Sequence, residues 1–128
     1  MWQLIQEMFK NERYLSQKTS NSIPVYFSNT TKITLLYGNR YEHDILLRDR
    51  LEKLAKSNPT RFKVIFTLSK PDFTWNKEKG RIGKEMIEKY FPAKNFDACF
   101  LCGTLRMMDD AKTHLTSIGH NPSNVFKY

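Results

Sequence analysis

The sequence predicts an α/β protein built on an open parallel sheet, because strand-like and helix-like patterns alternate along the chain. β-rich apolar runs lie at residues 33–37, 61–68 and 98–101, and helical stripes of apolar residues separate them. Right-handed crossovers keep such strands parallel, so that their carboxyl ends meet at one edge of the sheet. In this fold class, ligands bind along that edge.

The N-terminal quarter of the chain shows a helical pattern and then a polar stretch. Apolar residues recur at three- and four-residue spacing over 2–11, which predicts a helix. Ser, Thr, Asn and Lys dominate residues 14–32, which we expect to form a surface loop insertion. Within it, residues 23–27 match a short edge strand, since Pro24 argues against a central one.

The first two strand patterns enclose a predicted helix. The first run ends in the turn residues Gly38 and Asn39. Asp44 is placed to cap a helix that carries apolar residues from that point and ends before Pro59. The second strand, 61–68, follows directly.

The second half of the chain repeats this alternation. A polar loop holds Trp75, which we expect to pack over a helix rather than to stack on a ligand. Gly80 precedes a helical pattern that ends at Pro92, and Gly119 is placed to terminate the last helix. Residues 125–128 resemble a terminal strand. The apolar stripe of the last helix consists of Met107, Ala111, Leu115 and Ile118.

Length and charge limit the class of protein. The 128 residues are enough for one domain, and 21 basic against 13 acidic side chains give a net charge of +8, which favours anionic partners. No block of five or six Lys or Arg is present, so nucleic acid is not expected. No apolar run approaches the roughly 20 residues that span a bilayer, and the start does not resemble a signal peptide. We therefore expect a cytoplasmic protein, or one held at the cytosolic face of a membrane by a missing N-terminal part.

The two cysteines do not predict a metal site. Cys99 and Cys102 are three residues apart at the end of a strand, where they point to opposite faces and would not readily bridge or chelate together. No histidine lies at zinc-finger spacing from them. We expect Cys99 to be a core residue, whereas Cys102 stands where the strand opens into a helix.

Four segments resemble one family. Residues 37–48 (YGNRYEHDILLR) resemble the NRTEKDILLR segment of cytochrome-b5 reductases and of the related nitrate-reductase flavin domain. Residues 61–82 resemble their RFKLWYTL segment with the Trp and Gly that follow it. Residues 101–107 resemble their CGPPPM motif, and residues 119–126 match the way those proteins end. Four motifs in the right order make the resemblance specific.

The resemblance implies a Rossmann-like, ferredoxin-reductase-type NAD-binding domain over residues 1–128, with FAD on a barrel domain that this chain lacks. It also implies that hydride passes from NADH or NADPH to FAD, and that electrons then reach a haem protein such as cytochrome b5. Cys102 matches the cysteine beside the nicotinamide and the flavin, and is the catalytic candidate. The candidate cofactor-binding residues are Gly38, Asn39, Arg40, Ser69, Lys70, Cys102, Gly103, Thr104, Arg106 and Tyr128.

The residues after the second strand bear on cofactor choice. NADH-specific members of the family often have Asp there, a carboxylate that accepts from the ribose hydroxyls and repels a 2′-phosphate. This chain has Ser69 and Lys70 instead, which would tolerate or attract a phosphate. We therefore expect relaxed specificity, with NADPH accepted; the alternative is that Lys70 is a solvated loop charge.

The chain departs from the family pattern in two places. Thr104, Leu105 and Arg106 stand where the family has three prolines, which stiffen the loop under the nicotinamide. The strand and GGTGITP phosphate loop that precede the family's counterpart of residues 1–5 have no match here. We expect a fragment truncated at the N-terminus, or a gap filled by a partner chain or by residues 23–27. An open sheet centre also predicts a homodimer through exposed strand edges.

Two functional hypotheses follow from these observations. In the first, the chain is the NAD(P)H-binding, electron-input part of a flavoprotein reductase, inactive by itself. In the second, it is a non-catalytic α/β binding module that keeps the fold without binding nucleotide. Nucleotide binding distinguishes the two.

Overall fold

The computed structural model of the chain describes residues 31–128. The predicted helix over 2–11, the strand over 23–27 and nearly all of the 14–32 loop insertion lie outside the described residues. Thr31 and Lys32, the end of that insertion, are irregular and lead into the first described strand.

Strands and helices alternate through the described part of the chain, as the sequence predicts. The elements are β1 (Ile33–Asn39), a 3₁₀ turn (Glu42–Asp44), α2 (Arg48–Ser57), β2 (Phe62–Leu68), β3 (Glu78–Lys79), α3 (Lys84–Tyr90), a 3₁₀ turn (Ala93–Asn95), β4 (Cys99–Leu101), α4 (Leu105–Ser117), a 3₁₀ turn (Pro122–Asn124) and β5 (Val125–Lys127). All strand pairs among these elements are parallel, which confirms the predicted α/β class.

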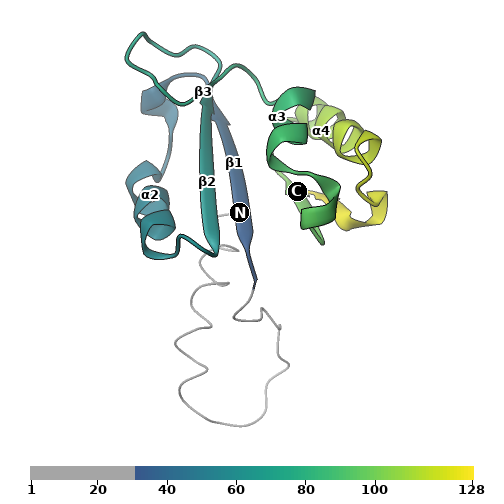
Figure 1. Cartoon of the computed structure of the whole chain (residues 1–128). Coiled ribbons are helices and arrows are strands. Elements are labelled where there is room, and N and C mark those ends of the chain that lie inside the picture. Colours follow the sequence, from purple (N-terminus) through teal and green to yellow (C-terminus); the bar gives the residue numbers. More distant parts are fainter. Residues whose placement is uncertain (1–30) are drawn as a thin grey trace, which may run out of the picture.

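The strands form two sheets rather than one. β1, β2 and β3 lie in that order, with Ile33 opposite Phe62 at the start of the β1–β2 ladder. β4 pairs with β5, with Cys99 opposite Val125. Within residues 31–128, β1 has a strand neighbour on one side only (Figure 1), and β4 also pairs on one side only.

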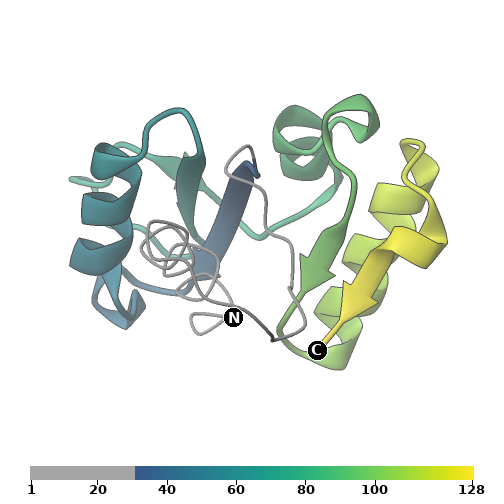
Figure 2. The ribbon, with the colours of Figure 1, turned by 90° about the horizontal axis from the view of Figure 1, so that it is seen from below.

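The helices divide between the two sheets. Figures 1 and 2 both show α2 beside β1 and β2, with α3 and α4 on the other side of the molecule near β4 and β5. Each sheet therefore has its own hydrophobic core. The first contains Ile45, Leu51, Phe62, Phe66, Leu68 and Trp75. The second contains Ile87, Cys99, Ala111, Leu115 and Val125.

Ile82 connects the two halves. It packs against the second core, and its Cδ1 lies 3.2 Å from where a Cβ on Gly38 of β1 would stand. A side chain at position 38 would press on Ile82, so glycine keeps β1 in close contact with the segment before α3.

The helix after β1 begins later than predicted. Asp44 does not cap α2: its carboxylate accepts from the amide of Tyr41 at 3.1 Å and closes a separate 3₁₀ turn. Leu47 then takes a left-handed conformation with φ of 59°, and α2 starts at Arg48. Ile45 still reaches the first core from outside the helix.

The segment between β2 and α3 also differs from the prediction. It contains the short strand β3, and α3 begins at Lys84 with Gly83 as its N-cap, four residues after Gly80. Trp75 anchors this segment, since its ring is only 4% exposed and its Nε1 donates to the carbonyl of Glu78 at 2.8 Å. The predicted packing role of Trp75 is confirmed.

The apolar stripe predicted for the last helix is confirmed at Ala111, Leu115 and Ile118 and differs only at its start. Met108, Ala111 and Leu115 are its buried residues, whereas Met107 is exposed. Thr104 is the N-cap of this helix, and the side chain of Met107 lies against Gly103 instead of in the core. The expectation that Met107 belongs to the core is therefore wrong.

Candidate functional site

The carboxyl ends of β1 and β2 bring five predicted site residues together. Gly38 and Asn39 end β1, Arg40 follows, and Ser69 and Lys70 follow β2. The amide of Ser69 donates to the carbonyl of Asn39 at 3.0 Å, and the amide of Lys70 donates to the carbonyl of Arg40 at 2.9 Å. The backbone itself therefore holds these two loops side by side.

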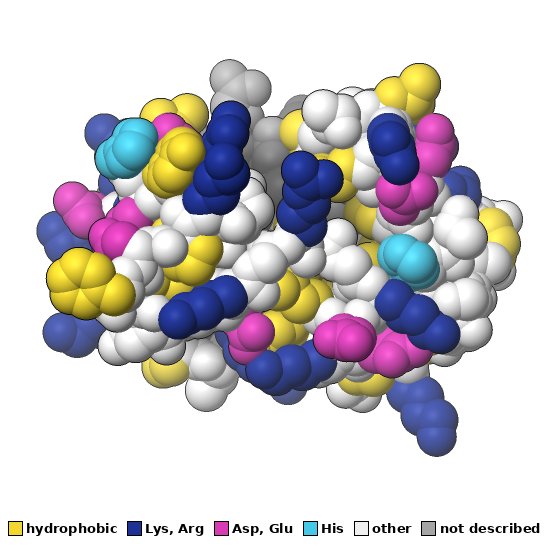
Figure 3. Space-filling model, turned by 90° about the horizontal axis from the view of Figure 1, so that it is seen from above, with side chains coloured by type: hydrophobic (Ala, Val, Ile, Leu, Met, Phe, Trp, Pro, Cys, Tyr) yellow, Lys and Arg dark blue, Asp and Glu magenta, His cyan; other side chains and the backbone are white. Residues whose placement is uncertain are grey.

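A hollow of about 340 Å³ opens at this place. Arg40, Ser69, Lys70 and Arg81 line it. Figure 3 views the molecule from above, the direction toward which β1 and β2 run in Figure 1, and shows Lys and Arg side chains gathered near the middle of that face. The hollow is therefore strongly cationic.

Arg81 is the residue of this hollow that the sequence analysis did not assign to the site. It lies eleven positions after Lys70, beyond β3. The amide of Gly80 donates to the carbonyl of Leu68 at 2.8 Å, and the hydroxyl of Thr67 donates to the carbonyl of Gly80 at 2.8 Å. These two bonds bring Arg81 to the end of β2. The position of Arg81 near the end of β2 follows only from the pairing of β3 with β2, which the sequence does not indicate.

Asn39 carries an unpaired donor at the same strand end. Its side-chain Nδ2 is buried and has no hydrogen-bond partner. Leaving a buried amide unpaired costs about 1–3 kcal/mol, and native structures seldom do so without a reason. A ligand acceptor at the end of β1 would satisfy this donor.

A second group of predicted residues lies where β4 gives way to α4. Cys102 follows β4 with an exposed thiol, and Gly103 separates it from Thr104, the N-cap of α4. The Oγ1 of Thr104 accepts from the amide of Met107 at 3.4 Å. The thirteen residues of α4 thus present a capped, electropositive helix N-terminus beside Cys102.

Tyr128 and Arg106 belong to this second group. The amide of Tyr128 donates to the carbonyl of Leu101 at 2.9 Å, which places the residue next to the end of β4. Its ring lies 6.0 Å from that of Phe100 and is 72% exposed. Arg106 lies in the first turn of α4 and is exposed.

Cys99 lies on the opposite side of β4 from this group. It is 7% exposed in the second core, and burial raises the pKa of its thiol. Both cysteines are free thiols in the structure. Among residues 31–128, no three His, Cys, Asp or Glu side chains are grouped so that they could hold a metal ion.

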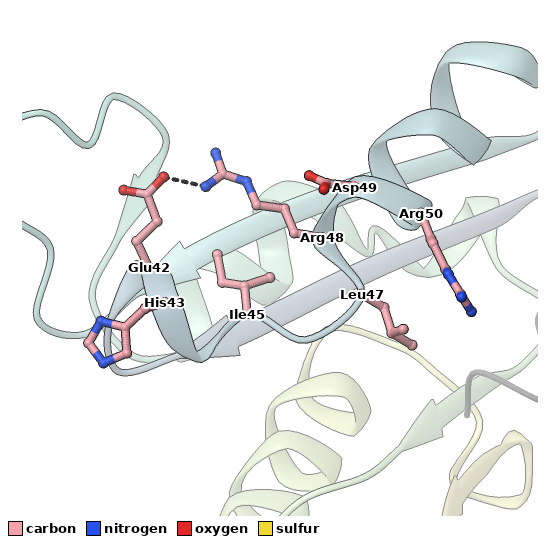
Figure 4. A pocket seen from close by; sticks show the side chains of 7 residues that line it. All are labelled: Glu42, His43, Ile45, Leu47, Arg48, Asp49 and Arg50. Atoms are coloured by element: carbon pink, nitrogen blue, oxygen red, sulfur yellow. Dashed lines mark hydrogen bonds and ion pairs between the residues drawn. The ribbon is translucent and has the colours of Figure 1, made fainter.

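A second hollow, of about 410 Å³, lies at the start of α2 and differs in its charges. Seven residues line it: Glu42, His43, Ile45, Leu47, Arg48, Asp49 and Arg50. Figure 4 shows the guanidinium of Arg48 directed at the carboxylate of Glu42, with which it forms an ion pair. Arg48 also pairs with Glu52 at 3.3 Å, and the hydrogen bond that it donates to Glu42 is the main cause that raises its pKa. Acidic partners thus neutralise Arg48, whereas the lining of the first hollow includes none.

Comparisons with known proteins identify the family of the chain. A family model described as an oxidoreductase NAD-binding domain matches residues 1–113. An NADH-cytochrome b5 reductase 1 of Dictyostelium discoideum is 40% identical over 103 residues, which cover 79% of this chain and 35% of that protein.

Solved structures show the same relationship. The cytochrome b5 reductase domain of Ulva prolifera nitrate reductase matches with a TM-score of 0.72 and 34% identity, covering 80% of this chain and 39% of that one. The CS-b5R domains of human Ncb5or, in a structure described as the NAD⁺ form, match with a TM-score of 0.69 and 25% identity, covering 76% and 28% of the two chains.

These matches define the class of protein as the pyridine-nucleotide-binding part of flavoprotein oxidoreductases of the ferredoxin-reductase type. The chain belongs to the oxidoreductase NAD-binding domain family and is homologous to the NAD-binding region of cytochrome b5 reductases. It spans 35% of the Dictyostelium relative and 32% of the relative from Meyerozyma guilliermondii. No helix among the described residues is long and apolar enough to cross a membrane.

Proposed function

We propose that this chain is the NAD(P)H-binding part of a cytochrome-b5-reductase-like flavoprotein oxidoreductase. FAD would lie on a barrel domain outside these 128 residues. The observation that carries the proposal is the juxtaposition of Cys102 and Gly103 with the N-terminus of α4, at the end of a parallel strand in a chain of the NAD-binding family. The CS-b5R domains of human Ncb5or, whose structure is described as the NAD⁺ form, support the same ligand.

The residues present fit a pyridine dinucleotide. The unpaired Nδ2 of Asn39 offers a buried donor to the adenosine half, and Arg40 supplies a neighbouring cation. The amides at the start of α4 offer donors to the pyrophosphate, and Arg106 lies in that first turn. Gly103 has no side chain, so the backbone there could approach the nucleotide closely once the flexible end of the Met107 side chain, which lies against it, moves aside.

The chemistry would belong to the cofactors, and the protein would orient them. When bound, NAD(P)H supplies a hydride, which is two electrons with one proton, from nicotinamide C4 to N5 of FAD. Cys102 would lie against the nicotinamide without donating or accepting a proton. Thr104 would keep the loop in place by capping α4, in the position where the family has prolines. Tyr128, next to the end of β4, would border the flavin side of the site.

We also propose that the electrons continue to a haem protein such as cytochrome b5. The net charge of +8 supports this step, because a basic surface attracts the acidic face of a partner and speeds its association. Raising the salt concentration should therefore slow electron transfer to the haem protein more than hydride transfer from the nucleotide.

A chimera tests the proposal. In it, the present chain replaces the matched region of the Dictyostelium discoideum relative, whose remaining part is expected to carry FAD. Adding NADH or NADPH under anaerobic conditions should bleach the flavin absorbance near 450 nm within seconds. A Cys102→Ala chimera should bind nucleotide and bleach more slowly, whereas Cys99→Ala, on the other side of β4, should bleach at the parent rate.

The opposite result has a definite meaning. If the chimera folds and holds FAD, but neither nucleotide binds nor bleaches it, the chain is a non-catalytic α/β module. The replacement of the family's prolines by Thr104, Leu105 and Arg106 would then be a loss of function.

The edge of β1 that faces away from β2 supports a separate proposal, a homodimer. Within residues 31–128, β1 pairs only with β2, and an unpaired strand edge can add another strand. The chain is expected to sediment as a dimer at high concentration and to dissociate on dilution. A monomer at all concentrations would contradict this proposal.

A further inference from the structure

The hollow lined by Arg40, Ser69, Lys70 and Arg81 is a preformed cationic site. We infer that it binds a phosphate monoester, namely the 2′-phosphate of NADPH, so that this chain prefers NADPH to NADH. The inference rests on the proposed function and names the cofactor of that same site.

Three segments of the chain each contribute one cation, and backbone bonds fix all three segments. The amide of Lys70 donates to the carbonyl of Arg40, and the amide of Gly80, which precedes Arg81, donates to the carbonyl of Leu68. Like charges on free loops would move apart. Here the strand ends hold them around one hollow, which lowers the cost of collecting them for a ligand.

Among residues 31–128, the three cations have no acidic partners. None of the ion pairs within residues 31–128 involves Arg40, Lys70 or Arg81. The only ring or side-chain contact described for them is that of Arg40, whose guanidinium lies 5.5 Å over the ring of Tyr41. Arg48 in the second hollow forms ion pairs with Glu42 and Glu52, so its charge is compensated within the protein.

The shape and chemistry of the first hollow suit a dianion. Two guanidinium groups can bind phosphate oxygens in a bidentate manner, an ammonium adds a point charge, and the hydroxyl of Ser69 adds one more donor. NAD-specific sites place a carboxylate near the ribose 2′-hydroxyl, whereas an arginine there accommodates a 2′-phosphate. A neighbouring ribose would also lie close to the unpaired amide of Asn39 at the end of β1.

Calorimetric titration of the 128-residue chain with adenosine 2′,5′-bisphosphate and with 5′-AMP isolates the contribution of the 2′-phosphate. The bisphosphate is expected to bind at least tenfold more tightly, with an advantage that shrinks as salt is added. Arg81→Gln and Lys70→Gln should each reduce the advantage by about tenfold. The matched control Lys53→Gln removes one exposed charge from α2 and should leave the advantage unchanged.

Ser69→Asp supplies a stronger test, because it adds the carboxylate that repels a 2′-phosphate. Position 69 is exposed, so the variant should fold, and its circular dichroism and melting temperature check that. It should abolish the advantage of the bisphosphate while 5′-AMP binding persists. Equal affinities for bisphosphate and 5′-AMP in the parent chain, or equal binding of inorganic phosphate, would overturn the inference.

The two proposals fail separately. If NADH bleaches the flavin of the chimera as efficiently as NADPH, the proposed function stands and the 2′-phosphate site is wrong. If the bisphosphate binds through Arg81 and Lys70 but neither nucleotide bleaches the flavin, the phosphate site stands and the oxidoreductase function is wrong.

Discussion

The Sγ of Cys99 lies 3.6 Å from Nδ1 of His120, and both side chains are buried. The Nε2 of His120 lies 2.7 Å from the carbonyl oxygen of Phe91. Since a carbonyl can only accept, Nε2 must carry the proton, which leaves Nδ1 free to accept from the thiol. His120 therefore joins β4 to the end of α3 and to the turn after α4.

Replacing His120 should destabilise the second core. His120→Ala removes both contacts and leaves the partly buried carbonyl of Phe91 without this donor, for an expected loss of about 2 kcal/mol in the free energy of unfolding. Urea denaturation measures it. His43→Ala is the control, because the side chain of His43 is 80% exposed, and its loss should stay below about 0.5 kcal/mol. Equal losses from the two variants would contradict the role of His120.

The Cys99 thiol should make stability decrease at alkaline pH. Burial raises its pKa above the ordinary 9.0, so the folded state keeps the proton to a higher pH than the unfolded state does. This contribution is fully present below pH 9.0 and is lost as the pH rises above it. Between pH 8 and pH 10 the free energy of unfolding should fall less in Cys99→Ala than in the parent. Cys102→Ala, which removes an exposed thiol, should keep the parent's slope.

Replacing Leu47 should stabilise the protein, because this residue has a left-handed backbone conformation with φ of 59°. That conformation costs a leucine about 1–2 kcal/mol, whereas asparagine adopts it more readily. Leu47→Asn is therefore expected to raise the free energy of unfolding by about 0.5–1 kcal/mol. Leu46→Asn is the matched control: that side chain is 71% exposed, and the residue does not have positive φ. If both variants raise the free energy of unfolding, the cause is the replacement of an exposed apolar side chain by a polar one and not the relief of backbone strain at position 47.

Asn39 should matter more for binding than for folding. Asn39→Ala removes a buried donor without a partner, so the free energy of unfolding should stay unchanged or rise. The affinity for NADH should fall by about tenfold, because the ligand loses a hydrogen bond in a buried position. Melting curves and calorimetry measure the two effects. Asn95→Ala changes an exposed asparagine in a 3₁₀ turn and should alter neither. A strong loss of stability in Asn39→Ala would show that this residue serves to stabilise the fold rather than to bind the ligand.

The strand ends could be predicted from the sequence because each one combines a β-rich run with turn residues. Asn39, Ser69 and Cys102 all lie where the pattern places them, at or just beyond the carboxyl end of a strand. The order of helices and strands could also be predicted, because apolar periodicity depends only on near neighbours in the chain.

What the sequence missed depends on contacts between distant segments. Glu78 and Lys79 have no strand propensity, and they form β3 only because Trp75 is buried and Gly80 bonds to Leu68. Arg81 reaches the hollow for the same reason. The true start of α2 depends on Asp44 closing its own turn, an alternative to capping that has the same sequence signature.

The two separate cores have a consequence for how the protein opens. Ile82 packs against one core and lies against Gly38 in the other half. Each half can then lose its structure as a cooperative unit with its own free energy. Amide protons of β2 and α2 should exchange as one group, and those of β4 and α4 as another. A dinucleotide that contacts Asn39 in one half and Cys102 in the other would slow exchange in both groups together, and would act as the clamp between them.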